Sequence, residues 1–264
     1  MPVLAVIPAR LDSTRLPRKP LQLLGGVPLV VRVYERVVAL GVADHCIVAT
    51  DASDVIDACA TYHVPTILTS AAHPSGTDRV AEVARLPDFV RYNIILNVQG
   101  DEPFVSTAAL NGAVDIVRTG LASIGTAAAP ASAAVLHRPD VVKVVRADDG
   151  RALYFSRAAI PFLRDEAESV LRDSMVLQHV GVYAYTAAAL AAWVALPPHP
   201  LERIERLEQL RPLAHGMTIG VASIASVDGG IDTEDDLVHA NVRWTQITAM
   251  HALAASHTLT MRNA

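Results

Sequence analysis

Residues 3–19 read VLAVIPARLDSTRLPRK, and this stretch decides the class of fold. Val3 to Ile7 is a solidly apolar run, which is typical of a strand buried on both faces of a sheet. A loop rich in proline follows. Residues 28–40 then have helical spacing, with Pro28 suited to the first turn and Gly41 to the C-terminal stop. Strand, loop and helix in this order predict the first unit of an α/β fold with a parallel sheet.

The alternation of strand and helix continues over about 120 residues. Further apolar runs read as buried strands, at residues 46–50, 65–68 and 93–98. Helical patterns lie between them, at residues 53–62 and from about residue 80 to residue 86. We therefore predict a mostly parallel, Rossmann-like sheet flanked by helices. Ligands of open α/β sheets bind beyond the carboxyl ends of the strands, so the polar clusters that follow these strands should lie close together. These clusters are residues 10–19, 73–79 and 99–102.

The second half of the chain is less regular. Strand-like segments occur at residues 141–145, 175–185 and 219–224. Residues 201–214 and about 235–255 read as helices, whereas residues 151–160 look ordered but irregular. No internal repeat and no flexible linker interrupts the chain. We therefore predict a single α/β domain over residues 1–264, with a core at about 1–130, a smaller mixed β region at about 131–225 and a C-terminal segment at 226–264.

The composition narrows the function classes. The 264 residues are 52% hydrophobic and 19% charged, which is typical of a globular protein and not of a disordered one. The net charge of −5 argues against a nucleic-acid partner. The only cysteines, Cys46 and Cys59, lack metal-type spacing, so we expect small core residues and no disulfide framework or zinc site.

The sequence also carries no targeting pattern that we can identify. No basic segment precedes an apolar one at the N-terminus, and Arg10 interrupts the first apolar run early, which argues against a signal peptide. No uninterrupted apolar segment reaches the length of about 18 residues that a membrane span needs. We therefore expect a cytoplasmic protein without a membrane partner.

Positive charge is concentrated in the first loop. Residues 10–19 contain four cations and one acid, Asp12, which gives a local net charge of +3 in an acidic protein; the cations are Arg10, Arg15, Arg18 and Lys19. Guanidinium groups bind phosphate oxygens through two parallel hydrogen bonds, and a lysine adds a compact charge. The loop therefore favours a phosphate-bearing ligand over the alternative of a solvated basic surface.

This loop, in the pattern IPAR…STRLP-x-KPL, resembles the nucleotide-binding loop of the CMP-Kdo synthetase (3-deoxy-manno-octulosonate cytidylyltransferase) family. In that family the loop wraps the triphosphate of CTP. The resemblance implies that Arg10, Arg15 and Lys19 bind the nucleotide and stabilise charge during catalysis, and that Ala9 and Ser13 also contact the nucleotide. Many relatives have Gly or Asn where this chain has Arg18, so the resemblance assigns no role to that residue.

The string NVQGDEP at residues 97–103 suggests a metal site. A carboxylate directly after a buried strand is well placed to hold Mg²⁺, which prefers a few carboxylates together with phosphate oxygens and water. A helix cap or a turn would explain Asp101 equally well. The whole string matches the same family, which implies that Asp101 is a catalytic Mg²⁺ ligand and that Gln99 faces both nucleotide and sugar.

A second carboxylate follows from the string IDTEDDL at residues 231–237. Thr233 and Asp236 have the spacing of a capping box, which explains Thr233 but not Asp232. The family pattern GxDTxEDL implies that Asp232 is the second Mg²⁺ ligand.

The loop HPSGTDR at residues 73–79 is less specific. Thr77 or Asp78 is suited to capping the helix that follows. The resemblance implies that the loop lies beside cytosine and ribose, with Ser75, Gly76 and Thr77 as nucleotide contacts.

Three strings in the second half match the family, at residues 153–157, 179–185 and 207–211. An acid sugar needs a guanidinium for its carboxylate and polar groups for its hydroxyls. The sugar-binding residues that the resemblance implies are Gln99, Arg157, His179, Tyr183, Glu208 and Gln209. Polar groups satisfied within a sheet, or the exposed face of a helix, are the alternatives for the single residues.

The resemblance thus implies a Mg²⁺-dependent enzyme that transfers CMP from CTP to the anomeric hydroxyl of Kdo. It also implies a homodimer joined through the mixed β region, in which the sugar binds, and a role in lipopolysaccharide biosynthesis. Activation of sialic acid or of an amino-substituted Kdo is the enzymatic alternative. A catalytically silent nucleotide-binding protein is the alternative from another class.

Overall fold

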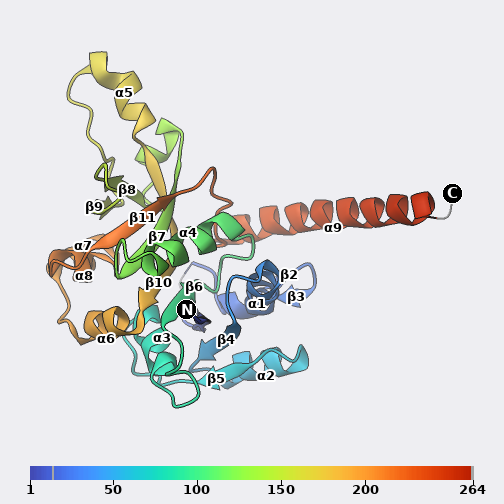
Figure 1. Ribbon diagram of the computed structural model, residues 1–264. Coiled ribbons are helices and arrows are strands. Elements are labelled where there is room, and N and C mark those ends of the chain that lie inside the picture. The colour runs from blue at the N-terminus through green and yellow to red at the C-terminus, as the bar shows by residue number, and fades with distance from the viewer. Residues whose placement is uncertain (14, 263–264) are drawn as a thin grey trace.

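The computed structural model describes the backbone of residues 1–13 and 15–262 and the side chains up to residue 250. Its core is a nine-stranded sheet, in which seven strands follow the order β11-β7-β10-β6-β1-β4-β5 (Figure 1). The parallel half consists of β5 (Thr66–Leu68), β4 (His45–Thr50), β1 (Val3–Ala9) and β6 (Ile94–Val98). The predicted α/β class and the mostly parallel sheet are confirmed.

The other half of the sheet mixes strand directions. β10 (Leu177–Thr186) runs antiparallel to both β6 and β7 (Ile124–Pro130), and β11 (Ile219–Ser223) is parallel to β7. Off this path, β8 (Lys143–Arg146) pairs with β10 and with β9 (Ala152–Ser156). A short hairpin, β2 (Leu23–Leu24) and β3 (Val27–Pro28), stands apart.

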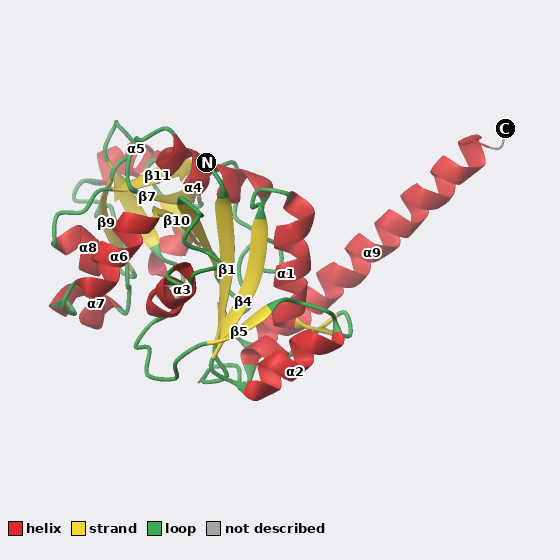
Figure 2. Cartoon of the chain, turned by 60° about the horizontal axis from the view of Figure 1, so that its bottom comes forward, coloured by secondary structure: helices red, strands yellow, loops and turns green. Residues whose placement is uncertain are grey.

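Helices cover both faces of the sheet (Figure 2). On one face α1 (Leu29–Leu40), α2 (Ser53–Thr61) and α4 (Thr107–Arg118) share a core cluster with the odd-numbered side chains of β1, such as Ala5 and Ile7. On the other face α3 (Gly76–Ala84) and α6 (Ala187–Ala195) share a second cluster with Leu4 and Val6. Burial on both faces explains why β1 has no polar residue, since successive side chains point to opposite sides.

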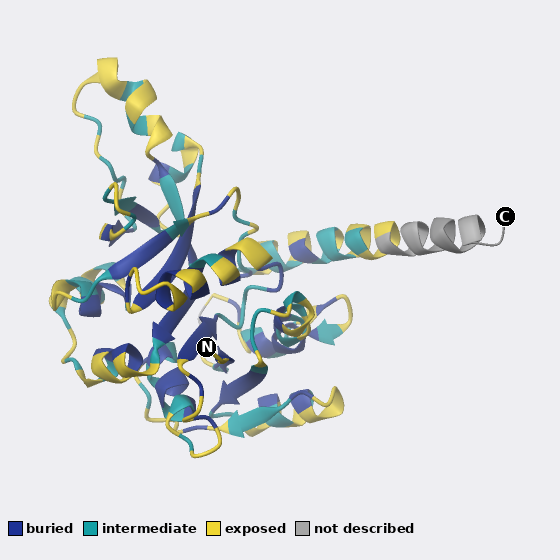
Figure 3. Cartoon of the chain, viewed as in Figure 1, coloured by how far each residue is buried: buried dark blue, intermediate teal, exposed yellow. Residues whose placement is uncertain are grey.

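Four further α-helices lie in the second half of the chain (Figure 1). They are α5 (Ser169–Ser174), α7 (Pro200–Glu205), α8 (Leu210–Ala214) and α9 (Glu234–Arg262). Figure 3 shows that α5 is largely exposed whereas the central strands are buried. The later part of α9 projects away from the sheet in Figures 1 and 2.

Several sequence predictions of single elements were wrong. Residues 201–214 form two helices, because the chain turns through a left-handed residue, Arg206, at φ 55°. Residues 152–156 form the regular strand β9, and residues 124–130 form β7, which was not predicted. α9 extends past the expected end near residue 255 to Arg262.

Candidate active site

The cationic loop leaves β1 at its carboxyl end, and a single turn of 3₁₀ helix over Lys19–Leu21 closes it. The loop borders a cavity of about 200 Å³ whose lining includes seven predicted site residues: Ala9, Arg10, Ser13, Lys19, Gly76, Gln99 and Asp101. The ends of β1 and β6 and the start of α3 meet here, as expected for parallel strands. The sequence-predicted clusters are therefore brought together.

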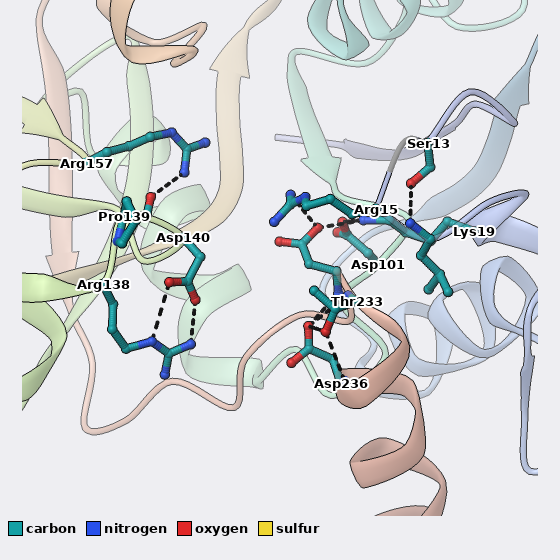
Figure 4. Close-up of polar contacts among 12 residues, drawn as sticks. Ser13, Arg15, Lys19, Asp101, Arg138, Pro139, Asp140, Arg157, Thr233 and Asp236 are labelled. Atoms are coloured by element: carbon teal, nitrogen blue, oxygen red, sulfur yellow. Dashed lines mark hydrogen bonds and ion pairs between the residues drawn. The ribbon is translucent and has the colours of Figure 1, made fainter.

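Lys19 points at both predicted metal ligands. Its Nζ donates hydrogen bonds of 2.7 Å to Asp101 Oδ2 and 2.7 Å to Asp232 Oδ1, and Arg15 Nη2 lies 3.0 Å from the same Asp232 oxygen (Figure 4). Burial by itself lowers the pKa of Lys19, but the two carboxylates outweigh burial and hold the pKa above its ordinary value. Two carboxylates from distant parts of the chain thus converge on one positive charge.

The start of α9 fixes the position of Asp232. Asp236 Oδ2 accepts hydrogen bonds from the backbone N–H of Asp232, at 3.1 Å, and of Thr233, at 2.9 Å (Figure 4). In return Thr233 Oγ1 accepts a bond of 3.2 Å from the N–H of Asp236. The predicted capping role of Thr233 is confirmed, and the cap leaves the Asp232 side chain available to the site.

Arg10 has unused hydrogen-bonding capacity. Its Nη1 donates to Pro74 O at 3.3 Å, while Nε and Nη2 are buried without a partner among the described residues. A buried guanidinium group with two free donors is costly unless a ligand satisfies it. Its place in the small cavity makes an anion the natural partner.

Arg18 does not line any of the cavities described here. It adopts a left-handed backbone at φ 53°, and its Nη2 lies 2.6 Å from Asp54 Oδ2 in the first turn of α2. Both side chains are about half exposed, so the pair ties the loop to α2 with little energetic effect.

A second cavity, of about 840 Å³, adjoins the first and shares Gln99 and Asp101 with it. Its lining includes every predicted sugar residue: Gln99, Arg157, His179, Tyr183, Glu208 and Gln209. Arg15, Thr77 and Asp232 also line it. The break between α7 and α8, which the sequence did not predict, places Glu208 and Gln209 at this cavity instead of on a helix surface.

The aromatic floor of this cavity is uncharged. His179 Nε2 lies 2.9 Å from Thr126 Oγ1, and the ring contacts Phe155 edge-on with ring centroids 5.1 Å apart. Burial lowers the pKa of the His179 imidazole to about 3, so the ring is neutral at physiological pH. Burial also holds the pKa of Tyr183 well above its usual range. These two groups offer hydrogen bonds but no charge.

The walls of the cavity carry the charges. Arg157 donates from Nε to Glu205 O at 2.9 Å and from Nη1 to Pro139 O at 2.9 Å (Figure 4). Glu208, also in the lining, accepts at Oε2 a hydrogen bond of 2.7 Å from Thr77 Oγ1. Arg157 and Glu208 are two of several charged groups that line the cavity around the neutral His179 and Tyr183.

The loop before α3 also has structural functions. Ser75, not Thr77 or Asp78, is the N-cap residue, since its Oγ accepts a hydrogen bond of 3.2 Å from Asp78 N. Arg79 is fully buried and pairs with Asp51 at 2.8 Å, so it belongs to the core. Ser75 lines a neighbouring cavity of about 790 Å³, and Gly76 and Thr77 line the other two.

Sequence reasoning missed several residues of the large cavity, among them Glu102, Arg138 and Asp140. Burial and then the charges of Asp101, Asp232 and Asp228 raise the pKa of Glu102 to about 8. Arg138 Nη2 forms an ion pair of 2.5 Å with Asp140 Oδ2 (Figure 4). Glu102 belongs to the string NVQGDEP, and its position next to Asp101 was the signal that could have identified it as a site residue.

Among the described residues, no group of three or more histidine, cysteine or acidic side chains is arranged to hold a metal ion. Within the same residues, no helix has both the length and the apolar character that a membrane crossing requires.

The parallel sheet, the cationic loop at its carboxyl edge and the converging carboxylates define an α/β nucleotidyltransferase type of site. The sequence model of the cytidylyltransferase family matches residues 4–219. The 3-deoxy-manno-octulosonate cytidylyltransferase of Gemmatimonas aurantiaca is 67% identical over 254 residues, which cover 96% of this chain and 98% of that one. The enzyme of the same name from Polynucleobacter necessarius is 46% identical, covering 89% and 92%.

Solved structures agree with this relationship. CMP:2-keto-3-deoxy-manno-octonic acid synthetase complexed with CTP superposes with a TM-score of 0.84 at 36% identity, covering 93% of this chain and 99% of that one. The 4-diphosphocytidyl-2C-methyl-D-erythritol synthase of Anaerococcus prevotii, at 15% identity and a TM-score of 0.60, covers 92% and 98% and shares the fold. The chain belongs to the 3-deoxy-manno-octulosonate cytidylyltransferase family.

Proposed function

We propose that this chain transfers CMP from CTP to the anomeric hydroxyl of Kdo and releases pyrophosphate. The observation that carries the proposal is the convergence of Lys19, Asp101 and Asp232 where the two cavities meet. The small cavity has the cations that a triphosphate needs, and the large one has the groups that an acid sugar needs. The same reaction is supported by the relatives, which are named 3-deoxy-manno-octulosonate cytidylyltransferase, and by the structural neighbour, which is a complex with CTP.

The nucleotide half of the site is assigned to the small cavity and to the adjoining parts of the other two. The triphosphate is bound by Arg10, Arg15 and Lys19. Two donor nitrogens of Arg10 have no partner among the described residues, and Lys19 and Arg15 here face Asp101 and Asp232. Ala9, Ser13, Ser75, Gly76, Thr77 and Gln99 contact the nucleotide around them. The anomeric hydroxyl of the sugar gives up its proton to solvent and its oxygen attacks the α-phosphorus. The bond from that phosphorus to the bridging oxygen breaks, and the electron pair leaves with pyrophosphate. The work of the protein is to position the reactants and to neutralise charge.

Magnesium fits the donor set. Asp101 and Asp232 are two hard oxygen donors that converge on a single cation, the Lys19 ammonium. Mg²⁺ is usually held by one or two carboxylates together with substrate phosphates and water, which matches this pair. We assign both aspartates to Mg²⁺. When bound, the ion neutralises phosphate charge and lowers the pKa of the attacking hydroxyl.

The sugar half is assigned to the large cavity. Arg157 pairs with the sugar carboxylate, since it is the predicted cation on that wall and its Nη2 is not engaged by the two hydrogen bonds that hold the guanidinium. His179 and Tyr183 on the floor, with Glu208, Gln209 and Gln99, bind hydroxyl groups. The neutral state of His179 suits this role, because a neutral imidazole both donates and accepts hydrogen bonds.

Two further parts of the proposal concern assembly and place. A homodimer is proposed through the second half of the chain, where Phe162, Val170 and Leu171 expose large apolar side chains around α5 (Figure 3). Transfer of CMP to Kdo places the enzyme in the cytoplasm, where CTP is available, on the route to lipopolysaccharide.

The test is pyrophosphate release from CTP and Mg²⁺ with Kdo, amino-substituted Kdo, sialic acid or no sugar. We expect release with Kdo that exceeds release with the other sugars. Equal or faster release with another acid sugar contradicts the assigned acceptor. CTP binding without release for any sugar contradicts the reaction itself.

A further inference from the structure

Lys143 on β8 is a buried lysine that the proposed reaction does not use. Its side chain is fully buried, and its Nζ donates to three backbone carbonyls, Val141 O at 2.7 Å, Arg138 O at 2.9 Å and Arg157 O at 2.5 Å. Among the described residues no carboxylate forms an ion pair with it. Burial and then the charge of Arg157 lower the pKa of Lys143. A buried ammonium with neutral acceptors only is costly, so it needs an explanation beyond packing.

The three carbonyls belong to two separate segments. Arg138 and Val141 bracket the loop that leads into β8, and Arg157 directly follows β9. Lys143 is opposite Ser156 in the β8–β9 ladder, so its ammonium reaches both segments from between them. The lysine therefore ties the loop at 138–141 to the end of β9.

The same two segments meet again at the cavity. Arg157 Nη1 donates to Pro139 O at 2.9 Å, so the position of Pro139 sets the orientation of the guanidinium (Figure 4). The backbone N–H of Arg157 donates to Glu205 Oε2 at 2.9 Å, and Nε donates to Glu205 O at 2.9 Å. These contacts engage the backbone N–H, Nε and Nη1 of Arg157, and none of them uses Nη2.

Lys143 itself does not line the cavity, whereas Arg157, Arg138 and Asp140 do. Any effect of the lysine on the substrate must pass through the residues that it holds. We propose that Lys143 is a positioning residue that presents Arg157 to the carboxylate of the acid sugar. The inference rests on the proposed function, because it needs Arg157 to bind the sugar.

The direct test is Lys143→Met, which keeps an unbranched side chain as far as the Cε position and removes the ammonium with its three hydrogen bonds. We expect the KM for Kdo to rise by roughly tenfold to a hundredfold, since small misplacements of a binding group have effects of this order. The KM for CTP should change by less than about threefold, because the nucleotide cavity lies on other elements. If Lys143 contributed only to general stability, the substitution would not change the KM for Kdo more than the KM for CTP.

The matched control is Arg146→Met on the same strand. Arg146 is partly buried, unlike the fully buried Lys143, and donates to one carbonyl, Val221 O at 3.2 Å, but it does not line the cavities. Both KM values of this variant should stay near those of the native enzyme. Lys143→Gln, which keeps a shorter donor, should give an intermediate KM for Kdo.

These experiments distinguish a failure of the proposed role of Lys143 from a failure of the proposed CMP transfer to Kdo. Native enzyme that releases no pyrophosphate with Kdo overturns the proposed function. Native enzyme that is active, together with an unchanged KM for Kdo in Lys143→Met, overturns the role of Lys143 alone. Loss of CTP binding in both Lys143 variants, measured by calorimetry, shows that the lysine holds the whole fold and also overturns the proposal.

Discussion

Lys19 and Asp232 are 213 positions apart in the chain, yet the ammonium of Lys19 donates a hydrogen bond of 2.7 Å to the Asp232 carboxylate. The same ammonium contacts Asp101 at 2.7 Å. One positive charge therefore holds together the ends of β1 and β6 and the start of α9. In the proposed reaction Asp101 and Asp232 would hold Mg²⁺, and Lys19 would bind the triphosphate.

Asp101→Asn tests the carboxylate pair. It keeps the size of the side chain but removes the charge that Mg²⁺ and Lys19 require. We expect the rate of pyrophosphate release to fall on the order of a thousandfold, as when other charge-stabilising groups are removed from active sites. CTP binding should survive in part, because Arg10 and Arg15 remain. Asp54→Asn, outside the cavities, is the control, and a near-normal rate for Asp101→Asn would refute the assignment.

Arg10 and Arg18 form a matched pair of cations from one loop. Arg10→Met removes two unpaired donors from the small cavity and should raise the KM for CTP by about ten- to a hundredfold, the equivalent of one charge-assisted hydrogen bond. Arg18→Met breaks only a half-exposed pair with Asp54, so its KM should change by less than about threefold. Equal effects of the two substitutions in steady-state kinetics would contradict the assignment of Arg10, and not Arg18, to CTP binding.

His179 makes stability depend on pH. Its pKa of about 3 in the folded protein lies below the ordinary value of 6.5, so the unfolded chain binds the proton more readily. The stability that comes from neutral His179 is therefore fully present above pH 6.5 and declines as the pH falls toward 3. Between pH 7.5 and 5.5 the native protein should lose about 1 kcal/mol more than His179→Gln in urea unfolding. Parallel losses in the two proteins would show that the ring titrates normally.

Gly25 and Gly26 in the β2–β3 turn provide a test of how α9 docks. Both have positive φ, at 57° and 79°, but a Cβ atom on Gly25 would overlap the Trp244 indole, whereas nothing lies within 4 Å of one on Gly26. Gly26→Ala should cost about 1 kcal/mol for its backbone alone. Gly25→Ala should cost a further 1–3 kcal/mol, roughly the penalty of overpacking. Denaturant unfolding measures both, and equal costs would exclude the contact with Trp244.

The parallel half of the fold was predictable because its strands are continuous apolar runs. Val3–Ala9 has buried residues at every position, and the loop that follows it brings Arg10 and Lys19 to the lining of the small cavity. Strand β7 was missed because its sequence, IGTAAAP, has small residues with weak strand preference. The reason lies in tertiary packing: a Cβ on Gly125 would overlap the Ala113 carbonyl of α4, so only small residues let this helix approach.

The sequence predicted residues that the fold gathers around neighbouring cavities, but it did not predict some of their contacts. The left-handed turn at Arg206 has no glycine to mark it, so residues 201–214 looked like one helix. Lys19 was expected at the triphosphate, whereas here it bridges the two carboxylates. Neither the buried Lys143 nor the raised pKa of Glu102 follows from spacing, because both depend on segments that meet only in the folded chain.

In the proposed reaction the α-phosphoryl group of CTP passes to Kdo as part of CMP. The most direct measurement is to incubate the enzyme with Mg²⁺, Kdo and CTP labelled at either the α- or the γ-phosphate, and to separate the products. We predict that the α-label appears in a sugar nucleotide and the γ-label in pyrophosphate, with neither product formed when Kdo is omitted. An α-label that remains in CTP or in free CMP, with no labelled sugar, would contradict transfer of CMP to Kdo.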